Sequence, residues 1–246
     1  TSERAWALGE RAQILSDAGK FADARMLLDE AMRLVDPQSA QADRSAIGQV
    51  HYRRGYAAWR LGDETTAERE MRAARDLMGV GHPLDADAAW VLGEIMQRQG
   101  KPQIAITYFD AVLTSHPDAR VAVLARLGPG VSRLHLNETD PAMVDLYEAT
   151  QEIGRRPARM KHRDAVVESL QQGQRILESR DEYAAALELL GYEKDLTPAP
   201  SPEFFGRMAS LFERRADQLD RSAAEGSPGG EPGSEQQGRG TGIPAG

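Results

Sequence analysis

The residues best suited to catalysis or metal binding are few and scattered in this sequence. The histidines lie at positions His51, His82, His116, His135 and His162. None has a second histidine four residues away, or an acidic residue at the spacing typical of a metal site. We therefore predict no metal site and interpret these histidines as surface or interhelical side chains.

Nucleophilic and phosphate-binding motifs are also missing. The chain has no cysteine, which excludes disulfides and thiolate catalysis. It has no Gly-x-Ser-x-Gly nucleophile motif, no phosphate-binding loop and no dinucleotide fingerprint. Gly128-Pro129-Gly130 has too few glycines for such a loop, and the short sequon Asn137-Glu138-Thr139 fits a turn equally well. We expect no cofactor and no enzymatic activity.

Carboxylates are abundant but follow the pattern of solvated helix faces. One stretch interleaves Glu64, Glu68, Glu70 and Asp76 with Arg69, Arg72 and Arg75. Pairs three or four residues apart on a helix stabilise it by about 0.2–0.5 kcal/mol each. General acid or base catalysis would also need a cleft that perturbs a pKa, which this pattern does not indicate.

The overall charge and hydropathy exclude further classes of partner. A net charge of −8 argues against nucleic acid, because phosphate binding needs a surplus of clustered Lys and Arg. The longest apolar run is Val121–Ala125, far short of the roughly 18 residues that cross a bilayer. We expect no membrane insertion and a soluble protein in the cytoplasm, with the periplasm as the alternative. The excess of Arg over Lys indicates a bacterial source.

An internal repeat governs the arrangement of the chain. Its anchors are the turn residues Gly19, Gly62, Gly100, Asn137 and Asp181, spaced by 43, 38, 37 and 44 residues. Five residues after each anchor comes an alanine: Ala24, Ala67, Ala105, Ala142 and Ala186. A period in this range is typical of repeat architectures.

Three further positions repeat with the anchors. Nine residues after them are Leu28, Met71, Phe109, Leu146 and Leu190. Twelve residues after them are Ala31, Ala74, Val112 and Ala149, and seven before them are Ala12, Gly55, Gly93 and Gly130. The fifth copy departs from the last two positions, with Glu193 and Gln174.

This pattern predicts pairs of antiparallel helices joined by tight turns. Helix axes can approach to about 8 Å only where small side chains line the crossing, so Gly and Ala recur at fixed distances from each turn. The large apolar residue between the alanines fills the space between the helices. Because one pair cannot bury its apolar face alone, we expect the pairs to stack.

The third copy resembles the tetratricopeptide repeat (TPR). Ala89-Trp90-Val91-Leu92-Gly93, followed by Gly100, Ala105, Phe109 and Pro117, is similar to that family's pattern of aromatic, Leu-Gly, turn Gly, Ala, aromatic and closing Pro. The resemblance extends over about residues 3–194 and is strongest up to 117. It implies an all-α solenoid of about five helix pairs in a right-handed superhelix, which binds proteins or peptides.

The repeats and the composition suggest three regions. We predict a repeat array over 1–196, a linker and capping helix over 197–221, and a disordered tail rich in Gly, Pro and Ser over 222–246. Ser201 is a natural N-cap for the last helix, with Pro202 at its first position. Within the array, Gly128-Pro129-Gly130 should kink or break a helix, because Pro costs about 3 kcal/mol in a helix interior.

The resemblance also implies that the first helices of successive pairs line a concave groove. The residues that would face it are Tyr52, Tyr56, Trp59 and Arg60 in the second copy, and Trp90, Glu94, Gln97 and Arg98 in the third. Tyr, Trp and Arg dominate binding hot spots, which makes this face a candidate partner site. The alternative is that these aromatic side chains pack between helix pairs as core.

The sequence thus favours a non-catalytic scaffold that binds a protein or peptide in its groove. One alternative is a regulatory or sensor segment of a larger signalling protein, such as a kinase or transcription regulator. Another is an enzyme whose active site occupies the groove. Self-association is a further possibility, because an exposed end of a truncated array can associate with another copy through its unburied face.

Overall fold

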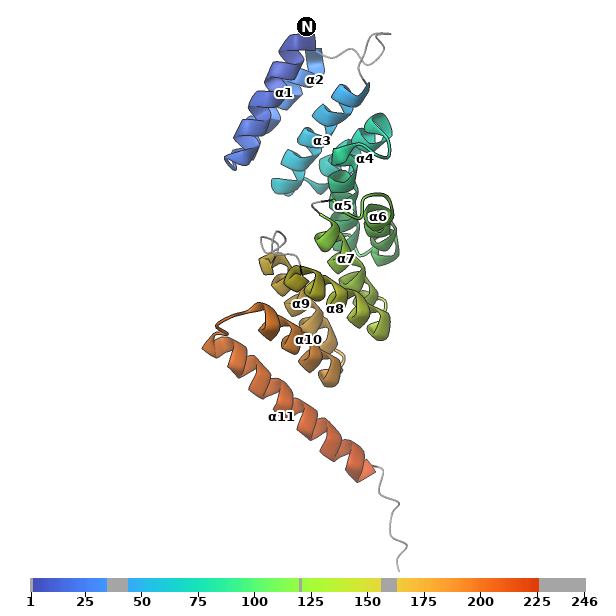
Figure 1. Cartoon of the computed structure of the whole chain (residues 1–246), viewed down its shortest axis with the longest axis vertical. Coiled ribbons are helices and arrows are strands. Elements are labelled where there is room, and N and C mark those ends of the chain that lie inside the picture. The colour runs from blue at the N-terminus through green and yellow to red at the C-terminus, as the bar shows by residue number, and fades with distance from the viewer. Residues whose placement is uncertain (1, 35–43, 120, 156–162, 226–246) are drawn as a thin grey trace, which may run out of the picture.

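The computed structural model of the chain describes residues 2–34, 44–119, 121–155 and 163–225. Over these residues the chain forms eleven α-helices and no strand (Figure 1). In chain order they are α1 (Ser2–Asp17), α2 (Phe21–Leu34), α3 (Arg44–Arg60), α4 (Glu64–Met78), α5 (Pro83–Arg98), α6 (Pro102–Ser115), α7 (Ala122–His135), α8 (Thr139–Arg155), α9 (Arg163–Glu178), α10 (Tyr183–Leu196) and α11 (Pro202–Glu225). The prediction of an all-α fold is confirmed.

Five tight turns join α1 to α10 into the predicted pairs. The anchor residue of every turn is left-handed, with φ of 74° at Gly19, 80° at Gly62, 69° at Gly100, 62° at Asn137 and 59° at Asp181. In each turn the anchor N–H donates to the carbonyl three residues earlier, and the next N–H donates to the carbonyl five residues earlier. This is the Schellman helix ending, which favours Gly or Asn at the left-handed residue.

The repeated small and large residues form the crossing of each pair. The five alanines that follow the anchors are completely buried, as are Leu28, Met71, Phe109 and Leu146. Close approach requires the glycines: a Cβ added to Gly93 would lie 2.5 Å from the Phe109 ring, and one on Gly130 would lie 2.7 Å from Leu146. The packing predicted from the repeat is confirmed.

Of the predicted kink or break at Gly128-Pro129-Gly130, the break is wrong. Helix α7 runs without interruption from Ala122 to His135, with Pro129 inside it. Both glycines are buried at close contacts, Gly128 against Phe109 and Gly130 against Leu146. Tertiary packing on both sides therefore outweighs the local preference of Pro and Gly against a helix.

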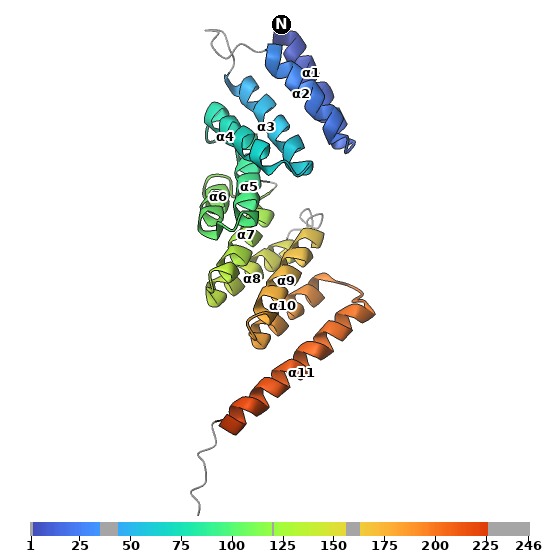
Figure 2. The same ribbon diagram turned by 180° about the vertical axis from the view of Figure 1, so that it is seen from behind.

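The pairs stack along the long axis of the molecule (Figures 1 and 2). The second helix of each of the first three pairs packs against the first helix of the next, as α2 does with α3, α4 with α5 and α6 with α7. The first helices α3, α5, α7 and α9 also contact one another in succession. Because of these successive contacts, α3, α5, α7 and α9 share one side of the stack.

The fifth pair uses a polar contact where the others use small residues. Gln174 and Glu193, which depart from the repeat pattern, are both buried, and Gln174 Nε2 donates to Glu193 Oε2 at 3.0 Å. Arg207 of α11 binds both, at 2.8 Å to Gln174 Oε1 and 2.6 Å to Glu193 Oε1. This polar cluster attaches α11 to the array.

Helix α11 begins where the sequence predicts it. Ser201 Oγ accepts a hydrogen bond from the Phe204 N–H at 3.3 Å, and Pro202 occupies the first helical position. The helix continues to Glu225, past the predicted boundary at 221, and buries Phe204 and Leu211 against the array. The rest of the predicted tail, 226–246, lies outside the described residues, and the division into three regions stays a prediction.

None of the helices in the described part of the chain has the length and apolar character that a bilayer span requires.

Candidate protein-binding groove

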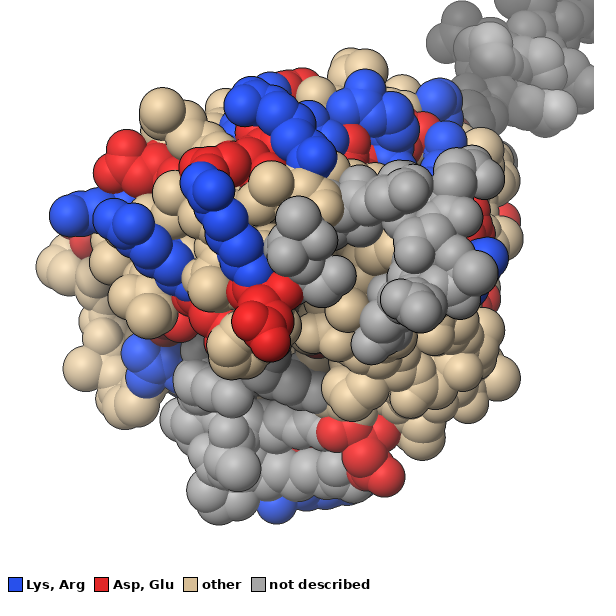
Figure 3. Space-filling view, turned by 90° about the horizontal axis from the view of Figure 1, so that it is seen from above, with Lys and Arg blue, Asp and Glu red and all other residues tan. Residues whose placement is uncertain are grey.

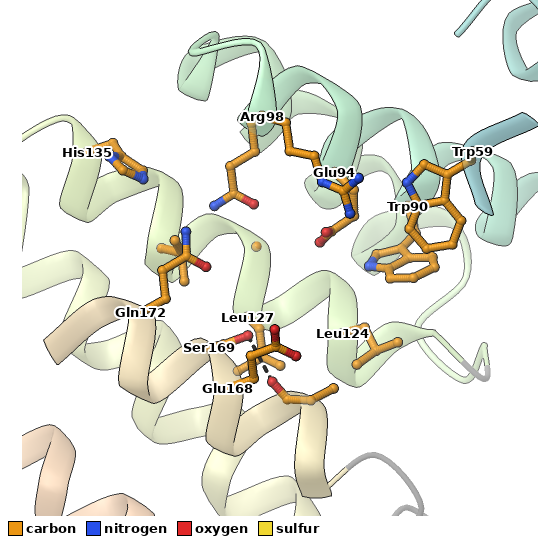
Figure 4. A pocket seen from close by; sticks show the side chains of 14 residues that line it. Trp59, Trp90, Glu94, Arg98, Leu124, Leu127, His135, Glu168, Ser169 and Gln172 are labelled. Atoms are coloured by element: carbon orange, nitrogen blue, oxygen red, sulfur yellow. Dashed lines mark hydrogen bonds between the residues drawn. The ribbon is translucent and has the colours of Figure 1, made fainter. Parts of the chain in front are cut away.

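A cavity of about 420 Å³ opens on the side of the stack formed by the first helices. Its lining comes from α3, α5, α7 and α9, that is, from four successive helix pairs. Five of the eight predicted groove residues line it, namely Trp59, Trp90, Glu94, Gln97 and Arg98 (Figure 4). The structure therefore brings most of the predicted residues together around one concavity.

The other three predicted residues, Tyr52, Tyr56 and Arg60, lie on α3 outside this cavity. Tyr52 is buried in the core at 8% exposure, so it is not open to a partner. Tyr56 is half-buried and accepts a hydrogen bond from Arg60 at 3.1 Å. Arg60 is exposed and lies over the Phe21 ring, with Cζ 4.5 Å from the ring centroid.

A row of aromatic rings connects these residues to the cavity. Ring centroids are 6.3 Å apart between Phe21 and Tyr56, 5.7 Å between Tyr56 and Trp59, and 5.4 Å between Trp59 and Trp90. Tyr56, Trp59 and Trp90 also pack on the core beneath them while keeping part of their surface open. Such edge and tilted contacts stabilise the row and hold the two tryptophans in place.

Sequence reasoning missed the opposite wall, which α7 and α9 supply. Leu124, Leu127, Val131 and His135 line the cavity from α7, and Glu168 lines it from α9 with its neighbours Ala165, Ser169 and Gln172. The α7 residues recur at a spacing of three or four, which would have indicated a common face. The expected break at Pro129 concealed that face. The α9 wall gave no comparable pattern, because only the stacking of distant repeats brings it opposite α5.

Two carboxylates meet in this cavity. Glu94 from α5 and Glu168 from α9 point into the same space from opposite sides (Figure 4). Burial raises the pKa of Glu94, and the nearby negative charge of Glu168 raises it further, while Arg98 acts in the opposite direction. Within the described chain neither carboxylate forms a hydrogen bond or an ion pair.

Besides acting on Glu94, Arg98 is engaged by two other residues. Arg98 Nη1 lies 3.6 Å from Glu64 Oε1, and its Cζ is 5.7 Å from the centroid of the Trp59 ring. Burial, together with the positive charge of Arg180, lowers the pKa of His135, which disfavours the charged form of its ring. The cavity is thus acidic, although one Arg lines it.

Three buried N–H donors beside the cavity lack an acceptor in the described chain: Trp59 Nε1, Trp90 Nε1 and Gln97 Nε2. The indole nitrogen of Trp90 is on the ring edge that faces the cavity (Figure 4). An unpaired buried donor costs about 1–3 kcal/mol. A ligand that offered an acceptor after a small rotation of these side chains would recover part of that free energy.

The described residues contain no group of His, Cys, Asp and Glu side chains that could hold a metal ion. Surface charge is mixed as well: at the N-terminal end of the molecule, basic and acidic side chains lie interspersed (Figure 3).

The tetratricopeptide-repeat model matches residues 52–120 and 96–157 of this chain. These ranges include the second, third and fourth helix pairs. The first and fifth pairs fall outside them although they have the same turn geometry. No curated protein matches the chain in sequence.

Solved structures extend the similarity over most of the described helices. A tetratricopeptide repeat protein from Parabacteroides merdae superposes with a TM-score of 0.59 at 16% identity, covering 90% of this chain and 77% of that one. The TPR-like repeats of a putative kinesin light chain from Podospora anserina give 0.59 at 13% identity, covering 79% and 95%. YrrB, described as a TPR protein with an unusual peptide-binding site, gives 0.53 at 16% identity, covering 78% and 85%.

These identities indicate a shared fold, and the sequence match covers the middle of the array. The described chain is an all-α solenoid with the fold of tetratricopeptide-repeat proteins, and its residues 52–157 match that family by sequence.

Proposed function

We propose that this chain is a non-catalytic scaffold that binds a peptide or an extended segment of a partner protein in the cavity between α3, α5, α7 and α9. The observation that carries this proposal is one concavity lined by four successive pairs, three of whose buried N–H donors have no acceptor within the described chain. Scaffolds of this fold act through protein contacts, and the net charge of −8 favours protein over nucleic acid.

The chemistry of the walls fits an extended peptide. A peptide backbone offers carbonyl acceptors at regular intervals, and the wall formed by α3 and α5 holds three N–H donors without acceptors. The two tryptophans and the apolar residues of α7 provide surface for side chains. YrrB has the same fold and is described as binding peptide at an unusual site, which supports the proposal by analogy.

Selection from a displayed library of random peptides tests the proposal. The library is selected on the immobilised full chain, and the dissociation constants of the recovered peptides are measured by calorimetry. Three variants change the cavity: Gln97→Ala, Gln172→Ala and Trp90→Phe, the last of which keeps an aromatic ring against the core and removes the indole N–H. We expect each to weaken binding about tenfold, the effect of roughly 1.4 kcal/mol of lost contact.

Ile104→Ala is the matched control. Ile104 is 46% exposed on α6, a second helix that contributes nothing to the cavity. Melting temperatures of all four variants should stay near that of the unchanged chain. The proposal is overturned if no peptide is recovered, or if recovered peptides bind the cavity variants as tightly as they bind Ile104→Ala.

A further inference from the structure

The cavity holds two carboxylates that form no hydrogen bond or ion pair within the described chain, although the charge of Arg98 acts on one of them, Glu94. Glu94 and Glu168 come from different repeats, α5 and α9, and each lies opposite the other (Figure 4). Three buried carboxylates at other helix interfaces do form ion pairs: Glu70 with His51 and Arg54, Asp85 with Arg75 and His116, and Glu193 with Arg207. Glu94 and Glu168 differ from these three.

The surroundings of the pair are apolar on one side. Leu124, Leu127 and Val131 of α7 form one wall of the cavity, and the Trp90 ring borders it. A ligand group that suits this lining has an aliphatic stem and a charged end, because the stem can lie along the leucines while the end reaches the carboxylates. Lys and Arg side chains have this form.

The remaining charges favour a cation over an anion. Among the described residues that line the cavity, Arg98 is the one Arg or Lys, and it also lies 3.6 Å from Glu64 and over the Trp59 ring. The pKa of His135 is lowered, which disfavours its charged form. The two carboxylates thus share one arginine that Glu64 also engages, so the lining favours an added positive charge.

We propose that the cavity binds a lysine or arginine side chain of the partner, with its charged end between the carboxylates of Glu94 and Glu168. The inference rests on the proposed function and names the chemistry of the anchor residue. Bringing the two carboxylates together is unfavourable without a ligand, and a cation between them removes that repulsion. The Trp90 ring adds a cation–π contribution when the charged group lies over its face.

Small probes of defined charge test this inference without a known partner. We would titrate the full chain with Nα-acetyl-arginine amide and Nα-acetyl-lysine amide, and compare them with Nα-acetyl-norleucine amide, which has a similar stem and no charge. The chain has three tryptophans, so indole N–H resonances report directly, each assigned from a Trp→Phe variant. Trp6, which is 66% exposed on α1, is the internal reference.

Both cationic probes should shift the Trp90 resonance in a saturable manner and leave Trp6 unchanged, whereas the norleucine probe should shift neither. In the double variant Glu94→Gln/Glu168→Gln the dissociation constants of the cationic probes should rise at least tenfold. The substitutions remove no hydrogen bond or ion pair of the described chain, so the fold should persist. Asp164→Asn is the control, because it removes a carboxylate of α9 that is 90% exposed.

Three results would overturn the inference: no Trp90 shift with either cationic probe, an equal shift with norleucine amide, or unchanged affinity in the double variant. The outcomes separate the two proposals. If the Gln97 and Gln172 variants bind the selected peptides more weakly while the cationic probes do not bind, the peptide groove is supported and the cationic anchor is contradicted. If the probes bind through Glu94 and Glu168 while no peptide binds less tightly to the cavity variants, the cation site is supported and the peptide groove is contradicted.

Discussion

The phenyl ring of Phe109 occupies the space that a side chain on Gly128 would need, because a Cβ at that glycine would lie 2.2 Å from Cε2. On its other side the same ring contacts Gly93, where an added Cβ would lie 2.5 Å from Cε1. Phe109 of α6 thus packs between α5 and α7 and joins the third helix pair to the fourth. The two glycines permit both close approaches.

Replacing Gly128 by alanine should therefore destabilise the chain although alanine favours a helix. Forcing an extra methyl group into a packed core costs about 1–3 kcal/mol. Alanine gains roughly 1 kcal/mol over glycine in helix propensity, so the packing cost should outweigh this gain where the core cannot relax. We expect a lower urea midpoint for Gly128→Ala, measured by circular dichroism. Adding Phe109→Leu should restore part of the loss because it removes the ring that the new methyl group meets.

Gly191→Ala is the control for this substitution. Gly191 lies in α10, and a Cβ added there meets nothing within 4 Å. Its replacement should raise stability by about 0.5–1 kcal/mol through helix propensity alone. Equal effects of the two alanine substitutions would show that the Phe109 contact does not require glycine.

The repeat could be predicted from the sequence because one physical constraint, either backbone conformation or packing space, decides the residue type at each of its positions. Gly19, Gly62 and Gly100 are needed for left-handed turns, and Asn137 tolerates that conformation. Gly93 is needed for the Phe109 contact. These local constraints recur in each helix pair, so they produce a periodic pattern that can be recognised without the tertiary structure.

Features that depend on compensation between distant residues were not predictable in the same way. Pro129 disfavours a helix locally, and only the contacts of Gly128 and Gly130 with the second helices of two pairs explain why α7 continues. Gln174 and Glu193 each depart from the repeat, and their mutual hydrogen bond emerges only when both helices are in place. The pairing of Glu94 with Glu168 likewise depends on how α5 and α9 stack.

Glu70 predicts a loss of stability in acid. This buried carboxylate of α4 contacts His51 at 2.8 Å and Arg54 at 3.1 Å. Burial alone would raise its pKa, but hydrogen bonds from His51 and Arg69 and the charge of Arg54 lower the pKa to about 2 from 4.5. Because the folded state holds the proton less tightly than the unfolded chain, the ionised group stabilises the fold by roughly 3 kcal/mol above about pH 4.5.

That stabilisation should disappear as the pH falls from about 4.5 to about 2. Glu70→Gln should be less stable at neutral pH, and its free energy of unfolding should change less steeply over this range than that of the unchanged chain. Urea unfolding at a series of pH values measures both. Asp164→Asn, at a carboxylate that is 90% exposed, should keep the original profile. An unchanged slope in Glu70→Gln would mean that another carboxylate causes the acid sensitivity.

The attachment of α11 should depend on Arg207 through the polar cluster of the fifth pair. Arg207 binds the buried Glu193 and Gln174, so its removal leaves Glu193 without its charged partner. Because Arg207 is 38% exposed, water screens part of this interaction, and we expect Arg207→Ala to weaken the docking of α11 by about 1–2 kcal/mol. Amide hydrogen exchange in α11 should then become faster.

The effect should stay local, because each pair of a solenoid contacts mainly its neighbours. Exchange in α1 and α2, at the other end of the stack, should not change. Arg214→Ala is the matched control on the same helix, since Arg214 forms a surface pair with Glu178 at 3.1 Å and is 51% exposed. If both arginine variants accelerate exchange in α11 equally, the apolar contacts of Phe204 and Leu211 hold the helix, and the polar cluster contributes only to the interior of the fifth pair.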